Sequence, residues 1–200
     1  MARTSRSAGR LGASPAAAMS GPGHMKGRTT MRVYAAIAGL VLIPALTSAQ
    51  EITDPQIASI VVTANQVDID AGRLAASKSE NGEVKAFAER MVTDHTGVNK
   101  SASDLVQKLG VTPEDNPTSR SLKEGGEKHL AKLKTLTGAA FDKAYIDHEV
   151  AYHQQVLDAL DATLVPGASN AELKALLVKV RPAFVAHLEH ARKLQSQLGS

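Results

Sequence analysis

The sequence predicts an all-α protein, a four-helix bundle with one long crossover that contains a short extra helix. Three observations predict it. The 200-residue chain has no Trp, 3% aromatic residues and much Ala, Leu and Val, a composition that favours helices over sheets. Four long segments place apolar residues at alternating steps of three and four, which is typical of helices that pack at shallow crossing angles. The connections between these segments are short, long and short, the pattern of a bundle with a single crossover.

The first two long helices are predicted at about residues 53–78 and 81–109. Thr53 and Gln56 form a capping-box pattern at the start of the first helix, and Gly110 ends the second. The turn between them is short, so we expect the two helices to be antiparallel. Their apolar faces consist of Ile57, Ile60, Ala64, Val67, Ala71 and Leu74 in the first helix, and of Val84, Phe87, Met91, Val98, Ala102, Leu105 and Leu109 in the second.

Residues 110–138 form the long connection. A shorter amphipathic segment at about residues 119–136 predicts the extra helix, with Ser121 and Glu124 as its cap. A connection of this length can traverse the bundle and leave the second and third long helices parallel. An array of independent hairpins is the alternative arrangement.

The third and fourth long helices are predicted at about residues 139–164 and 170–198. Pro166-Gly167 marks the turn between them, and Ser169 with Glu172 forms a capping-box pattern at the start of the fourth. Their apolar faces consist of Ile146, Val150, Leu157, Leu160 and Leu164 in the third helix, and of Leu173, Leu177, Val180, Phe184, Ala191, Leu194 and Leu198 in the fourth.

A targeting pattern precedes the helices. A short basic region leads into an apolar stretch at residues 33–46, and the small residues 47–49 follow it. This order predicts a signal peptide at residues 31–49, cleaved after Ala49, with an uncleaved anchor as the alternative. The apolar run is shorter than the roughly 20 residues that a membrane-spanning helix needs.

The domain assignment follows from this leader. Residues 1–30 are expected to be disordered or to precede the true start of the protein, residues 31–49 to be the signal peptide, and residues 50–200 to be the helical bundle. We therefore expect an exported protein in the periplasm, without a transmembrane span in its mature part. Whether it attaches to the outer membrane is left open.

The charge distribution and the missing residue types exclude several functions. Six of the 23 Lys and Arg residues precede residue 50, whereas none of the 20 Asp and Glu residues do, so the remainder is mildly acidic. It contains no basic run, and no nucleic-acid surface is expected. The absence of Cys excludes disulfides, thiolate metal sites and thiol catalysis. No Gly-rich phosphate loop, Ser–His–Asp pattern or H-E-x-x-H motif identifies a catalytic residue.

Polar residues interrupt the apolar faces of the four helices. His95, His153 and His187 occupy core positions on three helices, and Asp68 lies beside the apolar face of the first. At about 1.5 Å of rise per residue, counting from the helix ends places these four side chains within roughly 8 Å along the bundle axis. Glu149 lies one turn before His153 on the same face. The sequence therefore predicts a cluster of His and carboxylate side chains in the middle of the bundle.

Two main interpretations of this cluster stay open. A buried polar group without a partner costs about 1–3 kcal/mol, so the cluster needs partners. Imidazole and carboxylate together suit a transition metal such as Cu, Zn, Ni or Fe. The alternative is a hydrogen-bonded network that fixes the register of the helices, with or without ordered water. An organic ligand, haem included, is a third possibility. Asp94 can serve His95 or a neighbouring residue, whereas His129 and His190 are expected at the surface.

Three segments resemble one known family. They are FAERMVTDHTGVNK at 87–100, FDKAYIDHEVAYHQQVL at 141–157 and RPAFVAHLEHARKL at 181–194. They are similar to helix motifs of the bacterial domain of unknown function 4142, and the resemblance covers about residues 53–198. It implies a ferritin-like four-helix bundle with a long crossover and export in bacteria that have an outer membrane, but no activity. The motif positions that carry over are Asp94, His95, Asn99, Tyr145, His153, Pro182 and His187.

One departure from ferritin-like enzymes limits what this resemblance implies. Di-iron proteins of that superfamily use Glu-x-x-His on two helices, and no such motif occurs in this sequence. The leading interpretation is an exported envelope bundle that binds a transition metal or small ligand through the cluster. The alternatives are a structural or stress-related module that binds an envelope protein, and a metal-dependent redox enzyme. The oligomeric state is left open.

Overall fold

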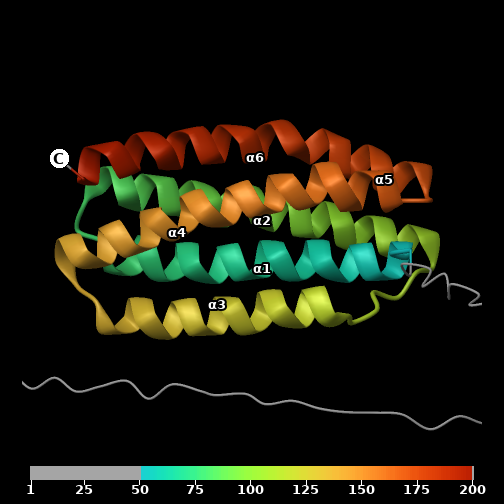
Figure 1. The fold of residues 1–200 in the computed structure, drawn as a ribbon, viewed down its shortest axis with the longest axis horizontal. Helices are drawn as coiled ribbons and strands as arrows, with labels where there is room; N and C mark the ends of the chain where they lie inside the picture. Colours follow the sequence, from blue (N-terminus) through green and yellow to red (C-terminus); the bar gives the residue numbers. More distant parts are fainter. Residues whose placement is uncertain (1–50, 200) are drawn as a thin grey trace, which may run out of the picture. The chain divides into compact units, whose positions relative to one another are not determined.

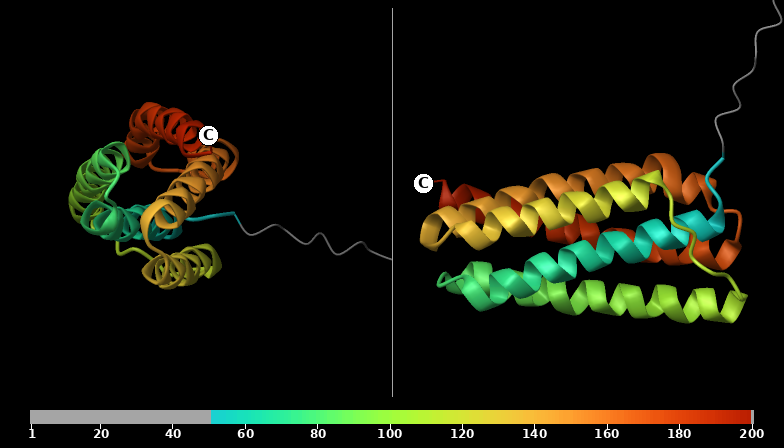
Figure 2. Two further views of the ribbon diagram at one scale, coloured as in Figure 1. Left: turned by 90° about the vertical axis from the view of Figure 1, so that its left-hand side faces the viewer. Right: turned by 90° about the horizontal axis from the view of Figure 1, so that it is seen from below.

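A computed structural model describes residues 51–199. Its four long helices are α1 (Asp54–Lys78), α2 (Gly82–Leu109), α4 (Gly138–Ala159) and α6 (Ala171–Leu198), and they surround a common core (Figure 2). The all-α, ferritin-like bundle class is confirmed. The assignments for residues 1–50, the signal peptide included, lie outside the described residues. No helix within residues 51–199 is long and apolar enough to cross a membrane.

The crossover follows the predicted path. The extra helix α3 (Pro117–Thr135) runs back along α1, so α2 and α4 point in the same direction (Figure 1). A side-chain bond from Asn116 to the backbone oxygen of Gln56 attaches the start of α3 to the start of α1. At the other end, the Lys78 ammonium donates to two carbonyls in the last turn of α3, at 3.3 and 2.8 Å. α3 therefore covers α1 from outside the four-helix core.

Several helix ends differ from the prediction. The Thr53 capping box and the left-handed Gly110, with φ of 64°, are confirmed. The predicted cap at Ser169 is wrong, because the Asn170 side chain accepts the first amides of α6 instead. The cap of α3 is likewise Asn116 and not Ser121.

The C-terminal part of the third long helix also differs from the prediction. α4 continues into a π-helical turn, Leu160–Leu164, and a short α5, Val165–Gly167. Pro166-Gly167 therefore ends this helix and does not form the turn, which comes after it.

A layer of polar side chains separates two apolar cores. One core gathers at the end of the bundle where α1 begins, and the other lies where α2 begins. On every long helix the polar positions fall between residues of the two cores. The layer consists of Asn65, Asp68, His95, Glu149, His153 and His187, all of which are buried.

Candidate metal centre

The structure brings together all of the residues that the sequence assigned to the cluster. The rings of His95 on α2, His153 on α4 and His187 on α6 form a nearly equilateral triangle, with centroids 5.5, 5.3 and 5.4 Å apart. One nitrogen of each ring lies within 4.8 Å of the others. The side chains are 4%, 1% and 0% exposed, so solvent does not satisfy them.

Asn65 fixes the orientation of the first histidine. The Nδ2 of Asn65 donates to the Val61 carbonyl at 2.7 Å, so its Oδ1 is left as an acceptor. Nδ1 of His95 lies 2.6 Å from that oxygen and must donate to it. The proton of His95 therefore sits on Nδ1, and Nε2 carries a lone pair.

The other two histidines have acceptors of their own. Nδ1 of His153 donates to the backbone oxygen of Glu149 at 3.0 Å, which leaves Nε2 as the lone-pair nitrogen. Nε2 of His187 lies 2.8 Å from Oδ2 of Asp94, which leaves Nδ1. Metal-binding histidines usually donate their second nitrogen to a carboxylate or carbonyl in this way.

Asp94 is held in its anionic form. Partial burial on its own would raise its pKa, but the hydrogen bonds from His187 and Arg90 lower the pKa of this carboxyl below its usual value. The Arg90 Nε lies 3.2 Å from Oδ2 of Asp94. Asp94 is thus an acceptor at neutral pH and can hold the His187 ring in place.

Asp68 supplies a carboxylate at the same level. Its Oδ2 lies 3.2 Å from Nε2 of His95 and 3.6 Å from Nε2 of His153. Neither carboxyl oxygen has a hydrogen-bond partner, and burial raises the pKa of Asp68 to about 8. A nearby cation would reverse this effect, because it favours the charged form of the carboxyl.

Glu149 and Tyr145 extend the cluster along α4. Oε2 of Glu149 lies 3.5 Å from Nδ1 of His153 and has no hydrogen-bond partner. Burial, followed by the charge of Asp68, raises the pKa of Glu149 well above its usual value. The buried Tyr145 hydroxyl is also unpartnered, and burial raises its pKa.

The histidines themselves are held neutral. Burial lowers the pKa of His95 well below its usual value and lowers that of His153 to about 4, with the neighbouring imidazoles adding to both shifts. Burial also lowers the pKa of His187, although Asp94 opposes that shift. All three rings therefore keep a free lone pair at neutral pH, which is the form that binds metals.

The cluster leaves many polar atoms without partners. At about 1–3 kcal/mol for each buried unpartnered group, the total is comparable with the roughly 5–15 kcal/mol by which a typical domain is stable. A divalent cation bonded to the inward atoms would remove most of this cost. The unpartnered atoms are Oδ1 and Oδ2 of Asp68, Nε2 of His95, Nε2 of His153, Nδ1 of His187, Oε2 of Glu149 and the Tyr145 hydroxyl.

Sequence reasoning missed some parts of the cluster. Asn65 was not assigned, although it lies three residues before Asp68 and so shares a helix face with it. Asp94 pairs with His187, whereas His95 was one of its expected partners. The predicted solvated position of His129 is wrong, because its ring stacks on His148 between α3 and α4, with centroids 3.5 Å apart.

Comparison with known proteins places the chain in a family. A family model described as "Domain of unknown function (DUF4142)" matches residues 43–194. The chain belongs to this family. No curated protein gave a significant match.

One solved structure from Streptomyces coelicolor, described as a candidate secreted protein, DUF305, has the same fold as this DUF4142 chain. The two are 12% identical with a TM-score of 0.62, over 72% of this chain and 93% of the other. At this identity the likeness concerns the fold alone.

Proposed function

We propose that this DUF4142 bundle binds one transition-metal ion in its polar layer. The ligands are Nε2 of His95, Nε2 of His153 and Nδ1 of His187, with the Asp68 carboxylate as the fourth and Glu149 assisting. The observation that carries the proposal is the pairing of each ring: one nitrogen donates to a fixed acceptor, and the opposite nitrogen faces the cluster without a partner. This is the arrangement that outer hydrogen bonds give to metal-binding imidazoles.

The donor set limits the choice of ion. Three imidazoles and a carboxylate suit Zn, Cu, Ni or Fe, and thiolate-preferring ions lack a ligand in a chain without Cys. The bound ion would compensate the charges of Asp68 and Glu149, both of which are buried. No reaction is assigned to the site, because the residues that surround it include no nucleophile activated by a base.

A hydrogen-bonded core that only fixes helix register is the competing function. A self-contained network would pair the inward nitrogens with the carboxyl groups, whereas the inward nitrogens of all three rings are without a hydrogen-bond partner. The unpartnered atoms therefore favour a bound cation over the network.

Calorimetric titration of the purified protein with Zn²⁺, Cu²⁺, Ni²⁺ and Fe²⁺ tests the proposal. We expect one ion per chain, with binding lost in His95→Ala, His153→Ala and His187→Ala. His190→Ala is the matched control, because this half-buried histidine on α6 packs against Phe87 outside the cluster. Absence of binding, or binding that all four variants retain, would leave the structural network as the function.

We further propose that the protein is exported to the cell envelope. The support is the targeting pattern at residues 31–49, together with a fold neighbour described as a candidate secreted protein. Expression in a bacterium with an outer membrane, followed by fractionation and N-terminal sequencing, is expected to give periplasmic protein that starts at Gln50. Recovery of unprocessed chain in the cytoplasm would refute export.

A further inference from the structure

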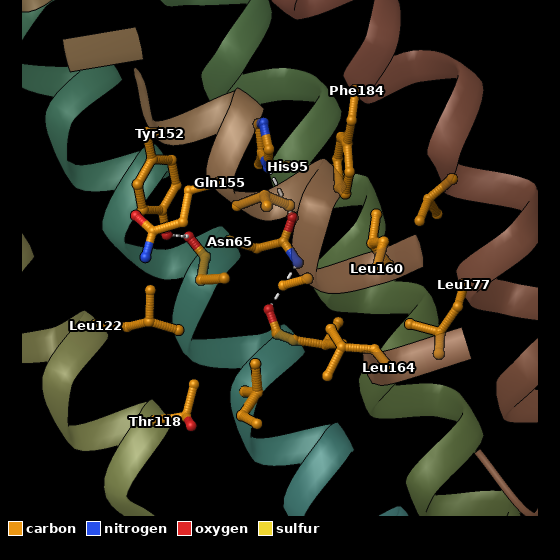
Figure 3. Close-up of a pocket in the computed structure, with 16 residues that line it drawn as sticks. Asn65, His95, Thr118, Leu122, Tyr152, Gln155, Leu160, Leu164, Leu177 and Phe184 are labelled. Carbon is orange, nitrogen blue, oxygen red and sulfur yellow. Dashed lines mark hydrogen bonds between the residues drawn. The ribbon is translucent and has the colours of Figure 1, made fainter. Parts of the chain in front are cut away.

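An apolar cavity of about 80 Å³ lies against His95, one of the three histidines of the cluster. Figure 3 shows the residues that line this cavity. His95, Asn65 and Phe184 form its wall on the side of the cluster. The ring of His95 is stacked on Phe184 at 5.1 Å, so both present flat apolar surfaces. Most of the remaining wall is aliphatic and includes Ile60, Val61, Val156, Leu160 and Leu177.

The Asn65 amide and the Tyr152 hydroxyl, two polar groups of the inner wall, are already bonded. Both ends of the Asn65 amide are used, one by Val61 and the other by His95. The Tyr152 hydroxyl donates to the Ala64 carbonyl at 2.9 Å (Figure 3). A buried water needs two to four polar partners, whereas an apolar cavity stays dry and takes nonpolar guests. The cavity therefore suits a nonpolar molecule better than water.

The π-helical turn contributes directly to this space. Leu160 and Leu164, its first and last residues, line the cavity, as does Ala159 just before it. A π turn inserts one extra residue into a helix, is rare, and occurs frequently at functional sites. This irregularity of α4 and the cavity thus coincide.

The cavity adjoins a hollow at the protein surface. A larger hollow of about 470 Å³ lies between α3 and α4. Thr118, Leu122, Tyr152 and Gln155 line both this hollow and the cavity, so the two spaces adjoin at these side chains. Thr118 and Gln155 are exposed, so the boundary between the hollow and the cavity reaches solvent.

We infer that the cavity is a binding site for a small nonpolar molecule of the size of dioxygen, admitted between α3 and α4 and held against the ring of His95. Its volume is about half of the roughly 150 Å³ of an apolar cavity that holds benzene or xenon, so a diatomic molecule fits better than an aromatic ring. The inferred role of this site rests on the proposed metal centre, because the bound molecule would lie beside His95, a proposed ligand of the metal.

Xenon binding to the purified, metal-free protein tests the inference. We expect the methyl resonances of Leu160 and Leu177 to shift and saturate with xenon pressure, and dissolved dioxygen to broaden the same resonances. Ala159→Phe fills the cavity and is expected to abolish both effects. Ala151→Phe, the same substitution at an exposed position of α4, is expected to leave them unchanged.

A second variant covers the case in which Ala159→Phe does not fold. Leu177→Ala enlarges the cavity and is expected to strengthen xenon binding. Shifts that rise linearly without saturation, or that are equal in wild type and Leu177→Ala, would overturn the inference. The xenon experiment uses metal-free protein, so its outcome is independent of metal binding. If the protein binds metal but not xenon, only this inference is refuted. The reverse result removes the proposed metal site alone.

Discussion

Residues 51–199 contain two groups of histidines that are shielded from solvent, the buried rings of the polar layer and a half-buried outer pair, and we propose an ion only for the first. In the polar layer, each ring donates one nitrogen to an acceptor and leaves the other without a partner, and the free nitrogens of His95 and His153 lie 3.2 and 3.6 Å from Oδ2 of Asp68. In the outer pair, defined as His129 and His148, the rings lie parallel at 14° and offer Nε2 and Nδ1 without partners. Burial is the main cause of a lowered pKa in both groups, giving about 3 for His129 and about 4 for His148.

The difference shows which features of the polar layer favour a bound ion and are missing from the outer pair. Low pKa values and unpartnered nitrogens are common to both groups. Lone pairs lie in the plane of an imidazole, so parallel rings cannot aim theirs at one point. The outer pair also has no carboxylate bonded to it and lies near Lys132, whose charge contributes to the lowered pKa of both rings. We therefore propose the ion for the polar layer because its lone pairs point towards one place and each ring donates to an acceptor. The number of histidines matters less.

The largest expected effect is loss of the ion itself. His153→Ala removes a ligand and is expected to abolish Zn²⁺ or Cu²⁺ binding, whereas His148→Ala is expected to leave the affinity unchanged. Calorimetric titration of both variants measures this contrast. Equal losses in the two variants would show that the two histidine groups act together and would end the comparison.

The next effect concerns an outer acceptor. Asp94→Asn replaces the anion that holds His187, and loss of such a partner typically weakens metal binding by about 10–100-fold. Asp104→Asn is the control, because this exposed carboxylate on the same helix pairs only with Lys100 among the described contacts. Competition against a chelator of known affinity measures both constants. An unchanged Kd for Asp94→Asn would show that the His187 ring is positioned by packing alone.

A smaller expected effect concerns folding stability, which should depend on the packing of α3 against α1 and not on the cluster. A Cβ added at Gly126 would lie 2.8 Å from two methyl carbons of Val67 on α1, whereas one at Gly125 meets nothing within 4 Å. We expect Gly126→Ala to destabilise the protein by about 1–3 kcal/mol through overpacking. Gly125→Ala is expected to stabilise it by about 0.4–1 kcal/mol.

Urea unfolding measures both glycine variants. Metal affinity is expected to stay the same in each, because α3 supplies no ligand. A weaker Kd in the Gly126 variant would show that the cluster depends on the docking of α3.

The smallest effect is a pH dependence of the outer pair. The folded-state pKa of His129, about 3, lies below its ordinary value of 6.5. Its neutral form therefore favours folding at and above pH 6.5, and this contribution is lost progressively as the pH falls from 6.5 towards 3. His129→Gln is expected to lose less stability between pH 7 and pH 4.5 than wild type in urea unfolding. Identical losses would mean that His129 does not titrate on unfolding.

The sequence predicted the level of the cluster because helix rise is constant. Counting residues from the ends of the helices was enough to align Asp68, His95, His153 and His187 along the axis. Counting gives no information on side-chain rotation, so the acceptor of each ring could not be predicted. Along the bundle axis Asp94 lies at the level of both His95 and His187. Only the rotation of α2 about its axis directs it to His187.

Other structural features depend on tertiary packing, which leaves no recognisable pattern in the local sequence. The face that α3 turns towards α4 is set by its docking on α1, so the stacking of His129 on His148 could not be predicted from a short amphipathic segment. The π turn at 160–164 also has no residue signature and was assigned to a regular helix. At the start of α6, both Ser169 and Asn170 are good N-caps, and Asp54 binds the backbone amides of both residues.

Each of the four proposed ligands comes from a different helix, and no two of them lie within one helical turn of each other. An unfolded chain therefore does not hold these four ligands close together. Binding of the ion would require that all four helices have assembled. The ion would stabilise only the finished bundle, by an amount that grows with the logarithm of its free concentration. Once inside, it could leave only when helices separate, so its residence time would follow local unfolding. A chain exported before folding would thus be loaded with the metal of the compartment in which it folds.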